Sequence, residues 1–391
     1  MNPDLKIESR QIPLGRPFFD EKEIEANRRI FDSSWVINGP EVRKFEAIFK
    51  NYIGVKNASA VISCTAGMHL ALSAFHLKPA EEVLLPTFNF IAAGLSVLQA
   101  GARPAFVDID QRTGTLDAAD LKRRVTPRSK AILALHCVGF PCAINEILQV
   151  ALANGLKVVE DAAHALGASY AGQRIGNHGD AVTFSFGPLK MICTGMGGMV
   201  TSGDASLIEK INQLRSYGMD KSMWDRREVA SPWSYSVSEL GHNFRMTDFQ
   251  AALGIEQMKK LDLFISVRRQ LAARYDKELK ELGFFDFFEP PSEAEAVPLY
   301  YAVKLIDGKG PSCRDDLVRF LIERGVGASV HWDPPLHLHP LFQRLGYRHG
   351  DFPQTEKLSK QVLSLPLHPA MTDEDVDYVT GRIREFFESR R

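Results

Sequence analysis

The stretch VVEDAAHALGASYAGQRIGNHGDAVTFSFGPLK, residues 158–190, contains two apolar runs, each followed by a polar residue suited to chemistry. Val158 and Val159 lead to the carboxylate of Asp161, and the run 181–186 leads through a short turn to Lys190. Such runs are typical of strands buried in an α/β sheet, and these folds keep their sites at the carboxyl ends of the strands. We therefore expect one carboxylate and one amine at the same edge of a sheet.

A carboxylate and a lysine amine form the pair that a pyridoxal phosphate enzyme requires. The amine forms a Schiff base with the cofactor aldehyde, and the carboxylate keeps the ring nitrogen protonated so that the ring can take up electrons. Asp161 and Lys190 fit these two catalytic roles. Taken alone, however, a lysine beyond a strand is more often a solvated surface charge. The assignment of Lys190 therefore depends on the rest of the chain.

Further motifs occur in order along the chain and together carry a resemblance. They are IPLGRPFFDEKEIEANRRIFDSSWVINGPEVRKFE at 12–46, SCTAGMHLALSAF at 63–75, PTFNFIAAG at 86–94, LGHNFRMTDFQAALG at 240–254, HWDPPLHLHPLF at 331–342 and LSLPLHPAMTDEDVDYV at 363–379. With residues 160–190 they resemble the DegT/DnrJ/EryC1/StrS family of sugar-nucleotide aminotransferases, from about Ile12 to about Phe387. Several motifs that occur in the family's order identify the family far more specifically than any single motif would.

The predicted order of elements agrees with this resemblance. Strands expected at 60–63, 83–85, 105–107 and 131–135 alternate with helices such as 68–75, which is typical of a mostly parallel sheet with helices on both faces. The resemblance implies the α/β class with the type I, aspartate-aminotransferase-like fold of pyridoxal phosphate enzymes. We place the large cofactor-binding domain at 1–263 and a smaller C-terminal α+β domain at 264–391.

The resemblance also implies which residues bind the cofactor. The segment 64–67, which lies between the expected strand and the helix expected at 68–75, would offer free backbone N–H groups at a helix N-terminus to the phosphate. Ordinary capping by Thr65 is an alternative. Phe90 matches a position whose ring stacks on the cofactor ring. As a lone histidine, His164 would more often be a satisfied structural group. The implied cofactor-binding residues are Thr65, Ala66, Phe90, Asp161, His164, Ser185, Lys190 and Asn243.

Other residues are implied to act between subunits or on the substrate. Asn243 matches a residue that relatives extend across a dimer interface to the partner's cofactor phosphate, so a homodimer with shared active sites is expected. Trp35 and His331 are candidates for substrate contact, with a packing role as the alternative for Trp35. The histidines in 331–339 lack a carboxylate or cysteine set that would complete a metal site, so no metal is expected. The polar stretch 217–236 is expected to be a long loop.

Composition restricts the class of protein. A chain of 391 residues with a formal net charge of −1 has no basic stripe for a nucleic acid, and its longest apolar segment is broken by Gln99 and Arg103, which argues against a membrane span. The polar start lacks the apolar core of a secretory signal. Five scattered cysteines suit reduced thiols better than disulfides. We expect a cytoplasmic protein.

These observations predict an aminotransferase that moves an amino group from glutamate to a keto group of a nucleotide-linked sugar, in amino-sugar biosynthesis. Lys190 would hold pyridoxal 5'-phosphate and then act as the base that moves a proton. Two alternatives remain open: a sugar dehydratase of the same family, and a non-catalytic regulatory homologue. The sequence leaves open the nucleotide (UDP, dTDP or GDP), the position of the keto group and the pathway.

Overall fold

The structure is a computed structural model that describes residues 10–221, 224, 226, 231, 233–306 and 314–390. Its centre is a seven-stranded sheet with the strand order β1-β11-β10-β7-β6-β2-β3. Within this sheet the strands from β10 to β3 pair in parallel, whereas β11 runs antiparallel to both of its neighbours. The prediction of a mostly parallel α/β sheet is confirmed.

The elements have the following bounds. The central strands are β1 Asn57–Val61, β2 Glu82–Pro86, β3 Arg103–Val107, β6 Ser129–Leu135, β7 Lys157–Asp161, β10 Ala181–Ser185 and β11 Gly198–Ser202. The other strands are β4 Ile109–Asp110, β5 Thr115–Leu116, β8 Ser169–Tyr170, β9 Gln173–Arg174, β12 Phe285–Phe287, β13 Ala294–Glu295, β14 Tyr301–Leu305 and β15 Val362–Leu365. The helices are α1 Glu21–Ser33, α2 Pro40–Ile53, α3 Cys64–Ala74, α4 Ile91–Gln99, α5 Ala118–Arg124, α6 Ile144–Asn154, α7 Ala205–Leu214, α8 Asp248–Leu282, α9 Arg314–Glu323, the 3-10 helix η2 Leu336–Leu338, α10 Pro340–Gln343, α11 Pro353–Gln361 and α12 Asp373–Glu388.

Helices cover both faces of the central sheet because successive side chains of each strand point to opposite faces. In β2, Leu84 belongs to the core that includes Phe45 of α2 and Ile255 of α8, whereas Val83 belongs to the core that includes Met68 of α3. All five side chains are buried. The near-continuous apolar runs of the central strands follow from this burial on two faces.

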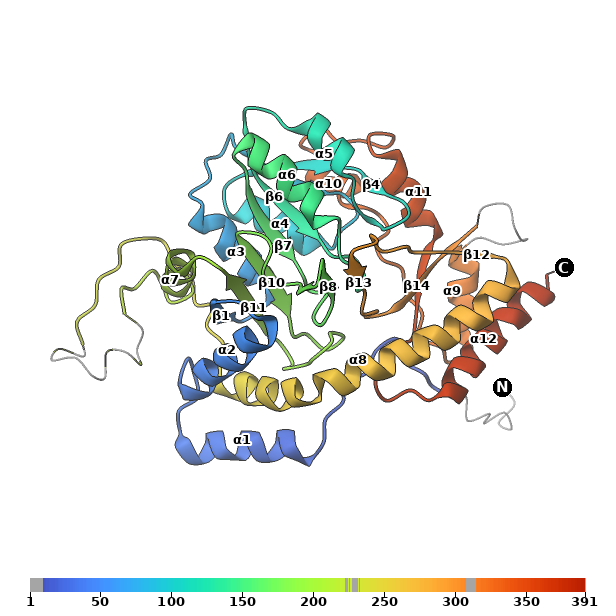
Figure 1. Ribbon diagram of the computed structural model, residues 1–391, viewed down its shortest axis with the longest axis horizontal. Helices are drawn as coiled ribbons and strands as arrows, with labels where there is room; N and C mark the ends of the chain where they lie inside the picture. The colour runs from blue at the N-terminus through green and yellow to red at the C-terminus, as the bar shows by residue number, and fades with distance from the viewer. Residues whose placement is uncertain are drawn as a thin grey trace, which may run out of the picture.

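A second sheet, with the strand order β12-β14-β15, lies at the other end of α8 (Figure 1). Helix α8 runs unbroken across the boundary predicted at residues 263 and 264. Its residue Phe264 still packs in the core of the central sheet, whereas Leu271 and Tyr275 pack in the core of the small sheet. The division into 1–263 and 264–391 therefore stays a prediction, with one helix serving both cores.

Other parts of the chain also pack across the predicted boundary. Ile12, near the start of the described chain, lies in the core of the small sheet and pairs with Val326. Conversely, Phe342 of α10 and Phe352, just before α11, pack in a core of the central sheet. These segments therefore tie the core of the small sheet to the cores of the central sheet.

The structure corrects the predicted start of one helix. The helix expected at 68–75 begins at Cys64, because Ser63 caps it by accepting a hydrogen bond from the backbone N–H of Ala66 at 3.1 Å. The capping alternative for Thr65 was therefore wrong, since Thr65 lies inside the first turn. The capping box formed by Thr247 and Gln250 at the start of α8 matches its sequence pattern.

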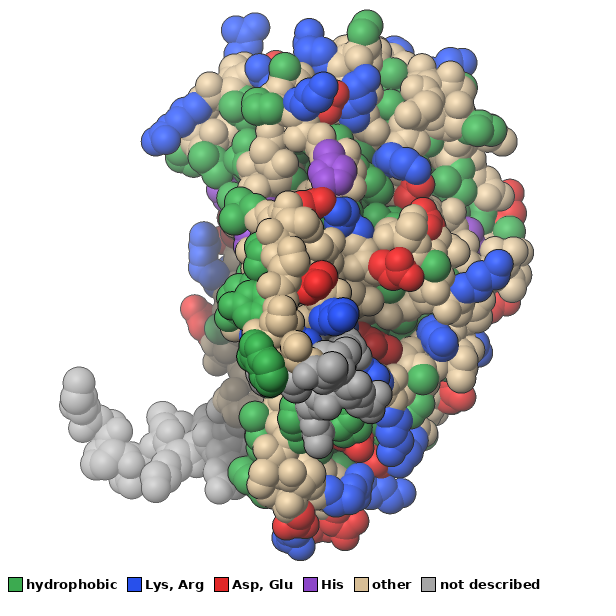
Figure 2. All heavy atoms as spheres, turned by 90° about the vertical axis from the view of Figure 1, so that its left-hand side faces the viewer, with side chains coloured by type: hydrophobic (Ala, Val, Ile, Leu, Met, Phe, Trp, Pro, Cys, Tyr) green, Lys and Arg blue, Asp and Glu red, His purple; other side chains and the backbone are tan. Residues whose placement is uncertain are grey.

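The surface is mixed in charge. On the face shown in Figure 2, basic and acidic side chains are interspersed with hydrophobic ones. Among the helices of the described residues, none has the length and apolar character needed to cross a membrane. Parts of the predicted loop 217–236 fall on residues 222–223, 225, 227–230 and 232, which lie outside the described residues, as does Cys313.

Candidate active site

A cavity of about 490 Å³ opens at the carboxyl ends of β7 and β10. Asp161 is the last residue of β7, and Lys190 lies in the turn that follows β10. Both side chains line this cavity, as do those of several other residues that the sequence singled out. Those residues are Thr65, Phe90, His164, Ser185 and His331. The parallel sheet thus brings together the carboxylate and the amine that lie far apart in the chain.

The amine of Lys190 is placed in surroundings that favour its neutral form. Burial lowers its pKa below the ordinary value, and the negative charge of Asp161 acts in the opposite direction. The backbone N–H of Lys190 donates to Gly187 at 3.1 Å, and the carbonyl of Leu189 accepts a hydrogen bond from the Tyr300 hydroxyl at 3.3 Å. The turn is therefore held from inside and from the neighbouring wall of the cavity.

Asp161 is fixed through one carboxylate oxygen. Its Oδ1 accepts a hydrogen bond from the backbone N–H of Ala163 at 3.0 Å and contacts the thiol of Cys64 at 3.7 Å. Burial raises the pKa of Asp161, while the Ala163 bond and the charge of Lys190 act to lower it. A buried carboxylate needs a cationic or hydrogen-bonding partner, which the cavity beside Lys190 has room to hold.

The rings of His164 and His331 form another part of the cavity wall. The Nδ1 atom of His164 accepts a hydrogen bond from the backbone N–H of Val138 at 3.3 Å, so its Nε2 atom carries the hydrogen of the neutral ring. Burial also keeps the pKa of His164 well below its ordinary value. Its ring stacks on Trp332 with centroids 5.9 Å apart. His331 stacks on Tyr300 with centroids 4.9 Å apart, and burial lowers its pKa to about 4.

The cavity fits an anionic ring compound such as a pyridoxal phosphate. Helix α3 begins at its edge, and the first-turn N–H groups of a helix have no intrahelical acceptors, which makes them donors for a phosphate. The side chain of Asn89 also lines the cavity, where its Nδ2 atom is buried without a hydrogen-bond partner. Its Oδ1 accepts from the backbone N–H of Phe90 at 2.7 Å, which fixes the amide so that Nδ2 is the free donor.

Three of the predicted residues do not line this cavity. Ala66 lies in the first turn of α3, but its N–H already donates to Ser63. Asn243 is exposed and accepts from Arg245 at 2.9 Å, and it lies outside the set of residues around Lys190. The indole N–H of Trp35 donates to the carbonyl of Ile37 at 3.0 Å. These positions agree with packing for Trp35 in this chain and leave the subunit-bridging role of Asn243 as a prediction.

Several residues of the cavity were missed from the sequence. Ser63, Asn89, Tyr300, Ser329 and Trp332 all line it. Asn89 stands next to Phe90 in the quoted motif, so the sequence could have placed it near the site. Nothing in the sequence, however, indicates that its side chain faces the cavity. The last three come from the segment 300–332, whose approach to the central sheet depends on long-range packing. Among the described residues, no group of three or more histidine, cysteine or acidic side chains could hold a metal ion.

The lowered pKa of Lys190 makes a prediction about its reactivity in the cofactor-free protein. An amine attacks an acylating reagent only when it is deprotonated, so the pH midpoint for labelling Lys190 should lie below that of a free lysine side chain in a reference peptide. Mass spectrometry after labelling with acetic anhydride at a series of pH values, with the reference peptide added, measures both midpoints in one sample. An equal or higher midpoint for Lys190 would show that its amine is not held in its neutral form.

Comparison with known proteins gives a consistent family. The sequence model of the DegT/DnrJ/EryC1/StrS aminotransferase family matches residues 17–384. The chain is 38% identical over 377 residues to the spore coat polysaccharide biosynthesis protein SpsC of Bacillus subtilis, covering 96% of each chain. It is 36% identical to the GDP-perosamine synthase of Caulobacter vibrioides, covering 95% of this chain and 97% of that one. The crystal structure of the aminotransferase TlmJ from Streptoalloteichus hindustanus matches with a TM-score of 0.88 and 31% identity, covering 97% and 99% of the two chains.

Proposed function

Because this chain belongs to the DegT/DnrJ/EryC1/StrS aminotransferase family, we propose that its cavity transfers an amino group from glutamate to a keto group of a nucleotide-linked sugar. The chain is a sugar aminotransferase that depends on pyridoxal phosphate, with the aspartate-aminotransferase-like fold. The observation that carries the proposal is the placement of Lys190 and Asp161 on one buried cavity at the strand ends. Lysine, carboxylate and helix terminus are the three groups that this cofactor needs.

Different residues of the cavity would contact different parts of the cofactor. When bound, pyridoxal phosphate supplies an aldehyde that takes up the amino group and a ring that accepts electrons. In our proposal the first turn of α3 with Thr65 and Ser185 would hold the phosphate, and Phe90 would contact the ring. The Nε2–H of His164 would be the donor for the ring hydroxyl.

Two side chains perform the chemistry in this proposal. The neutral Nζ atom of Lys190 would move a proton from the α-carbon of glutamate to the cofactor in the first half-reaction. In the second half-reaction it would move a proton from the cofactor to the sugar carbon that receives nitrogen, so one amine would serve both. Its lowered pKa favours this use as a base near neutral pH. The Oδ1 atom of Asp161 is occupied by Ala163 and Cys64, and we propose that Oδ2 faces the ring nitrogen and keeps it protonated.

The reaction is tested by following both products. Purified protein with pyridoxal phosphate, glutamate and a panel of UDP-, dTDP- and GDP-linked ketosugars should release 2-oxoglutarate in a one-to-one ratio with an amino sugar nucleotide. Loss of water from a sugar nucleotide without 2-oxoglutarate would assign the chain to dehydration instead. No turnover of any sugar nucleotide by protein that binds the cofactor would favour a regulatory role and contradict the proposal.

We further propose that the enzyme is a homodimer in which Asn243 of each copy contacts the cofactor phosphate of the other. Asn243 is exposed, and it lies outside the cavity of its own chain. The outer side of α1 supplies apolar surface for such an interface, because Ile24 is 56% and Phe31 70% exposed and both line a shallow apolar hollow with Leu253 of α8. An exposed apolar patch of this kind marks an interaction site.

The dimer is tested by charging this surface. Ile24→Glu should shift the protein from the mass of two chains to that of one in light scattering coupled to size exclusion, because a buried unpaired carboxylate is costly. The matched control is Leu152→Glu on α6, where the native leucine is 86% exposed. An Ile24→Glu protein that stays dimeric would exclude this side of α1 from the interface.

A cytoplasmic location is also proposed. It is supported by four buried cysteines among the described residues that form no disulfide, as is usual in a reducing compartment.

A further inference from the structure

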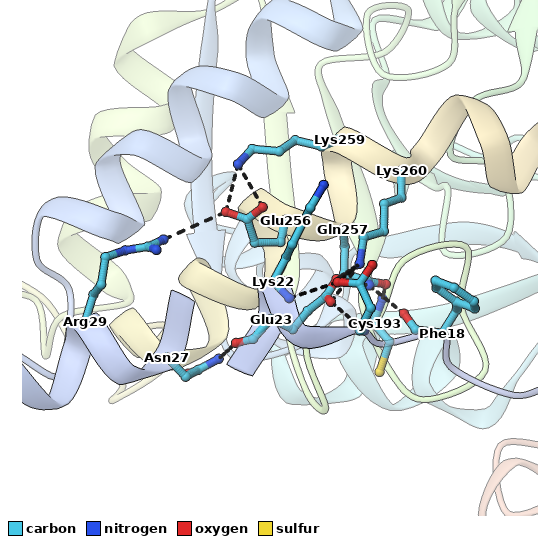
Figure 3. Close-up of polar contacts among 11 residues, drawn as sticks. Phe18, Lys22, Glu23, Asn27, Arg29, Cys193, Glu256, Gln257, Lys259 and Lys260 are labelled. Carbon is cyan, nitrogen blue, oxygen red and sulfur yellow. Dashed lines mark hydrogen bonds and ion pairs between the residues drawn. The ribbon is translucent and has the colours of Figure 1, made fainter. Parts of the chain in front are cut away.

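A chain of buried polar groups joins α1 to Cys193, in the turn that carries Lys190 (Figure 3). Its members are not among the residues that line the cavity. Its members are Glu23 of α1, Gln257 and Lys260 of α8, and the backbone of Cys193, three residues beyond Lys190. Glu23 is 2% exposed and Gln257 is 1% exposed. Burying a carboxylate and an amide is costly unless both are hydrogen-bonded or paired. Because each of these groups has its partners, the pairing favours one particular arrangement of α1, α8 and the turn.

The side-chain amide of Gln257 is the centre of this chain. Its Oε1 accepts a hydrogen bond from the backbone N–H of Cys193 at 3.2 Å. Its Nε2 donates to Oε1 of Glu23 and to the carbonyl of Phe18, both at 2.8 Å. The N–H of Cys193 requires an acceptor, and the carboxylate and carbonyl require a donor, so the amide fits in one orientation. One side chain therefore touches both α1 and the turn after Lys190.

The α1 end of the chain is firmly held. The Nζ atom of Lys260 lies 2.7 Å from both carboxylate oxygens of Glu23 and 2.9 Å from Oδ1 of Asp20. Glu23 also closes the capping box of α1 by accepting the backbone N–H of Asp20 at 2.9 Å. Lys260 and Gln257 of α8 thus hold the start of α1 against that helix.

The turn that carries Lys190 depends on contacts from outside it. Within the turn, Thr194 donates to the carbonyl of Phe186 at 2.9 Å. From outside, Tyr300 holds Leu189 before the lysine, while Gln257 holds Cys193 and Gln250 holds the Met196 carbonyl after it. Gln250 and Gln257 both belong to α8, but Gln257 is the one bonded to Glu23.

We propose that Gln257 is a positioning residue that couples the seating of α1 on α8 to the position of the Lys190 turn. It touches neither the cavity nor the reacting atoms, and it acts through the backbone of Cys193. The functional meaning rests on the proposed role of Lys190. Helix α1 also carries the apolar surface that we propose as the dimer interface. The hydrogen bonds of Gln257 to Glu23 and Cys193 would therefore transmit a shift of α1 at that interface to the Lys190 turn.

The first test uses the cofactor-free protein and does not depend on the role of Lys190. Gln257→Met removes three hydrogen bonds with little change in volume, and it should raise amide hydrogen exchange in peptides from 187–197 by about fivefold or more. Glu23→Met should raise the same exchange, although its side chain does not contact the turn. The control is Lys259→Met on α8, whose ion pair with Glu256 stays within that helix (Figure 3). Unchanged exchange at 187–197 in Gln257→Met and Glu23→Met would overturn the proposal.

The second test asks whether the coupling reaches the lysine itself. In the holoenzyme, the pH midpoint of the visible band of the Lys190-bound cofactor should rise by roughly 0.3–1 unit in Gln257→Met, because a looser turn admits water that favours the protonated form. Adding Glu23→Met to Gln257→Met should produce no further shift, since both act through one bond path. Additive shifts, or equal midpoints in Gln257→Met and Lys259→Met, would reduce Gln257 to an ordinary structural residue. Failure of the band to depend on Lys190 would contradict the proposed function instead.

Discussion

Lys190→Ala is expected to lower turnover by on the order of 10⁴-fold or more, because it removes both the covalent attachment of the cofactor and the base that moves the proton. The turn after β10 places this amine on the cavity, and burial lowers its pKa. Steady-state assays with glutamate and a ketosugar nucleotide measure the loss.

Two controls separate chemistry from folding in this experiment. Lys157→Ala removes an exposed lysine that pairs with Asp180, and it should leave turnover nearly unchanged. The melting temperature of Lys190→Ala should equal or exceed that of the native protein without cofactor, since burying an amine is unfavourable. Turnover within a few-fold of the native value in Lys190→Ala would refute the assignment of the lysine.

Asp161→Asn is expected to lower turnover by about 10²–10⁴-fold, because a neutral amide no longer keeps the ring nitrogen protonated. The substitution preserves shape, and its carbonyl oxygen can still accept the 3.0 Å hydrogen bond from Ala163. The variant should therefore fold and still attach the cofactor to Lys190. Absorption spectra and single-turnover kinetics distinguish this outcome from loss of binding.

The matched control for Asp161→Asn is Asp180→Asn. Asp180 precedes β10 and accepts the backbone N–H of Val158 at 2.8 Å, so it lies at the opposite end of the same two strands. Its replacement is expected to affect stability and to leave the chemical step unchanged. If Asp180→Asn lowered the chemical step as much as Asp161→Asn did, the role of Asp161 would be reduced to general support of the sheet.

The sequence predicted the parts of this enzyme that local patterns determine. The buried runs before Asp161 and Lys190 became β7 and β10, and their carboxyl ends lie at one cavity, as parallel strands require. The capping pattern at Thr247 and Gln250 placed the start of α8. The start of α3 was placed too late because Ser63, a short polar residue at the end of an apolar run, was counted with the strand.

The remaining parts depend on contacts between distant segments, which no local pattern encodes. Tyr300 and Trp332 reach the cavity because α8 and the small sheet bring their segment against the central sheet. Gln257 has the sequence context of an ordinary polar residue in an amphipathic helix, and its contact with Cys193 appears only in three dimensions. The predicted domain boundary illustrates the same point, since α8 packs in both cores.

The visible absorption spectrum of the purified protein with pyridoxal phosphate, before and after glutamate, tests the central claim most directly. Our account predicts a band that forms with the native protein, is absent with Lys190→Ala, and is replaced by that of the aminated cofactor when glutamate is added. A band that forms equally well with Lys190→Ala, or that glutamate leaves unchanged, would contradict the claim that this cavity is the site of amino transfer from glutamate.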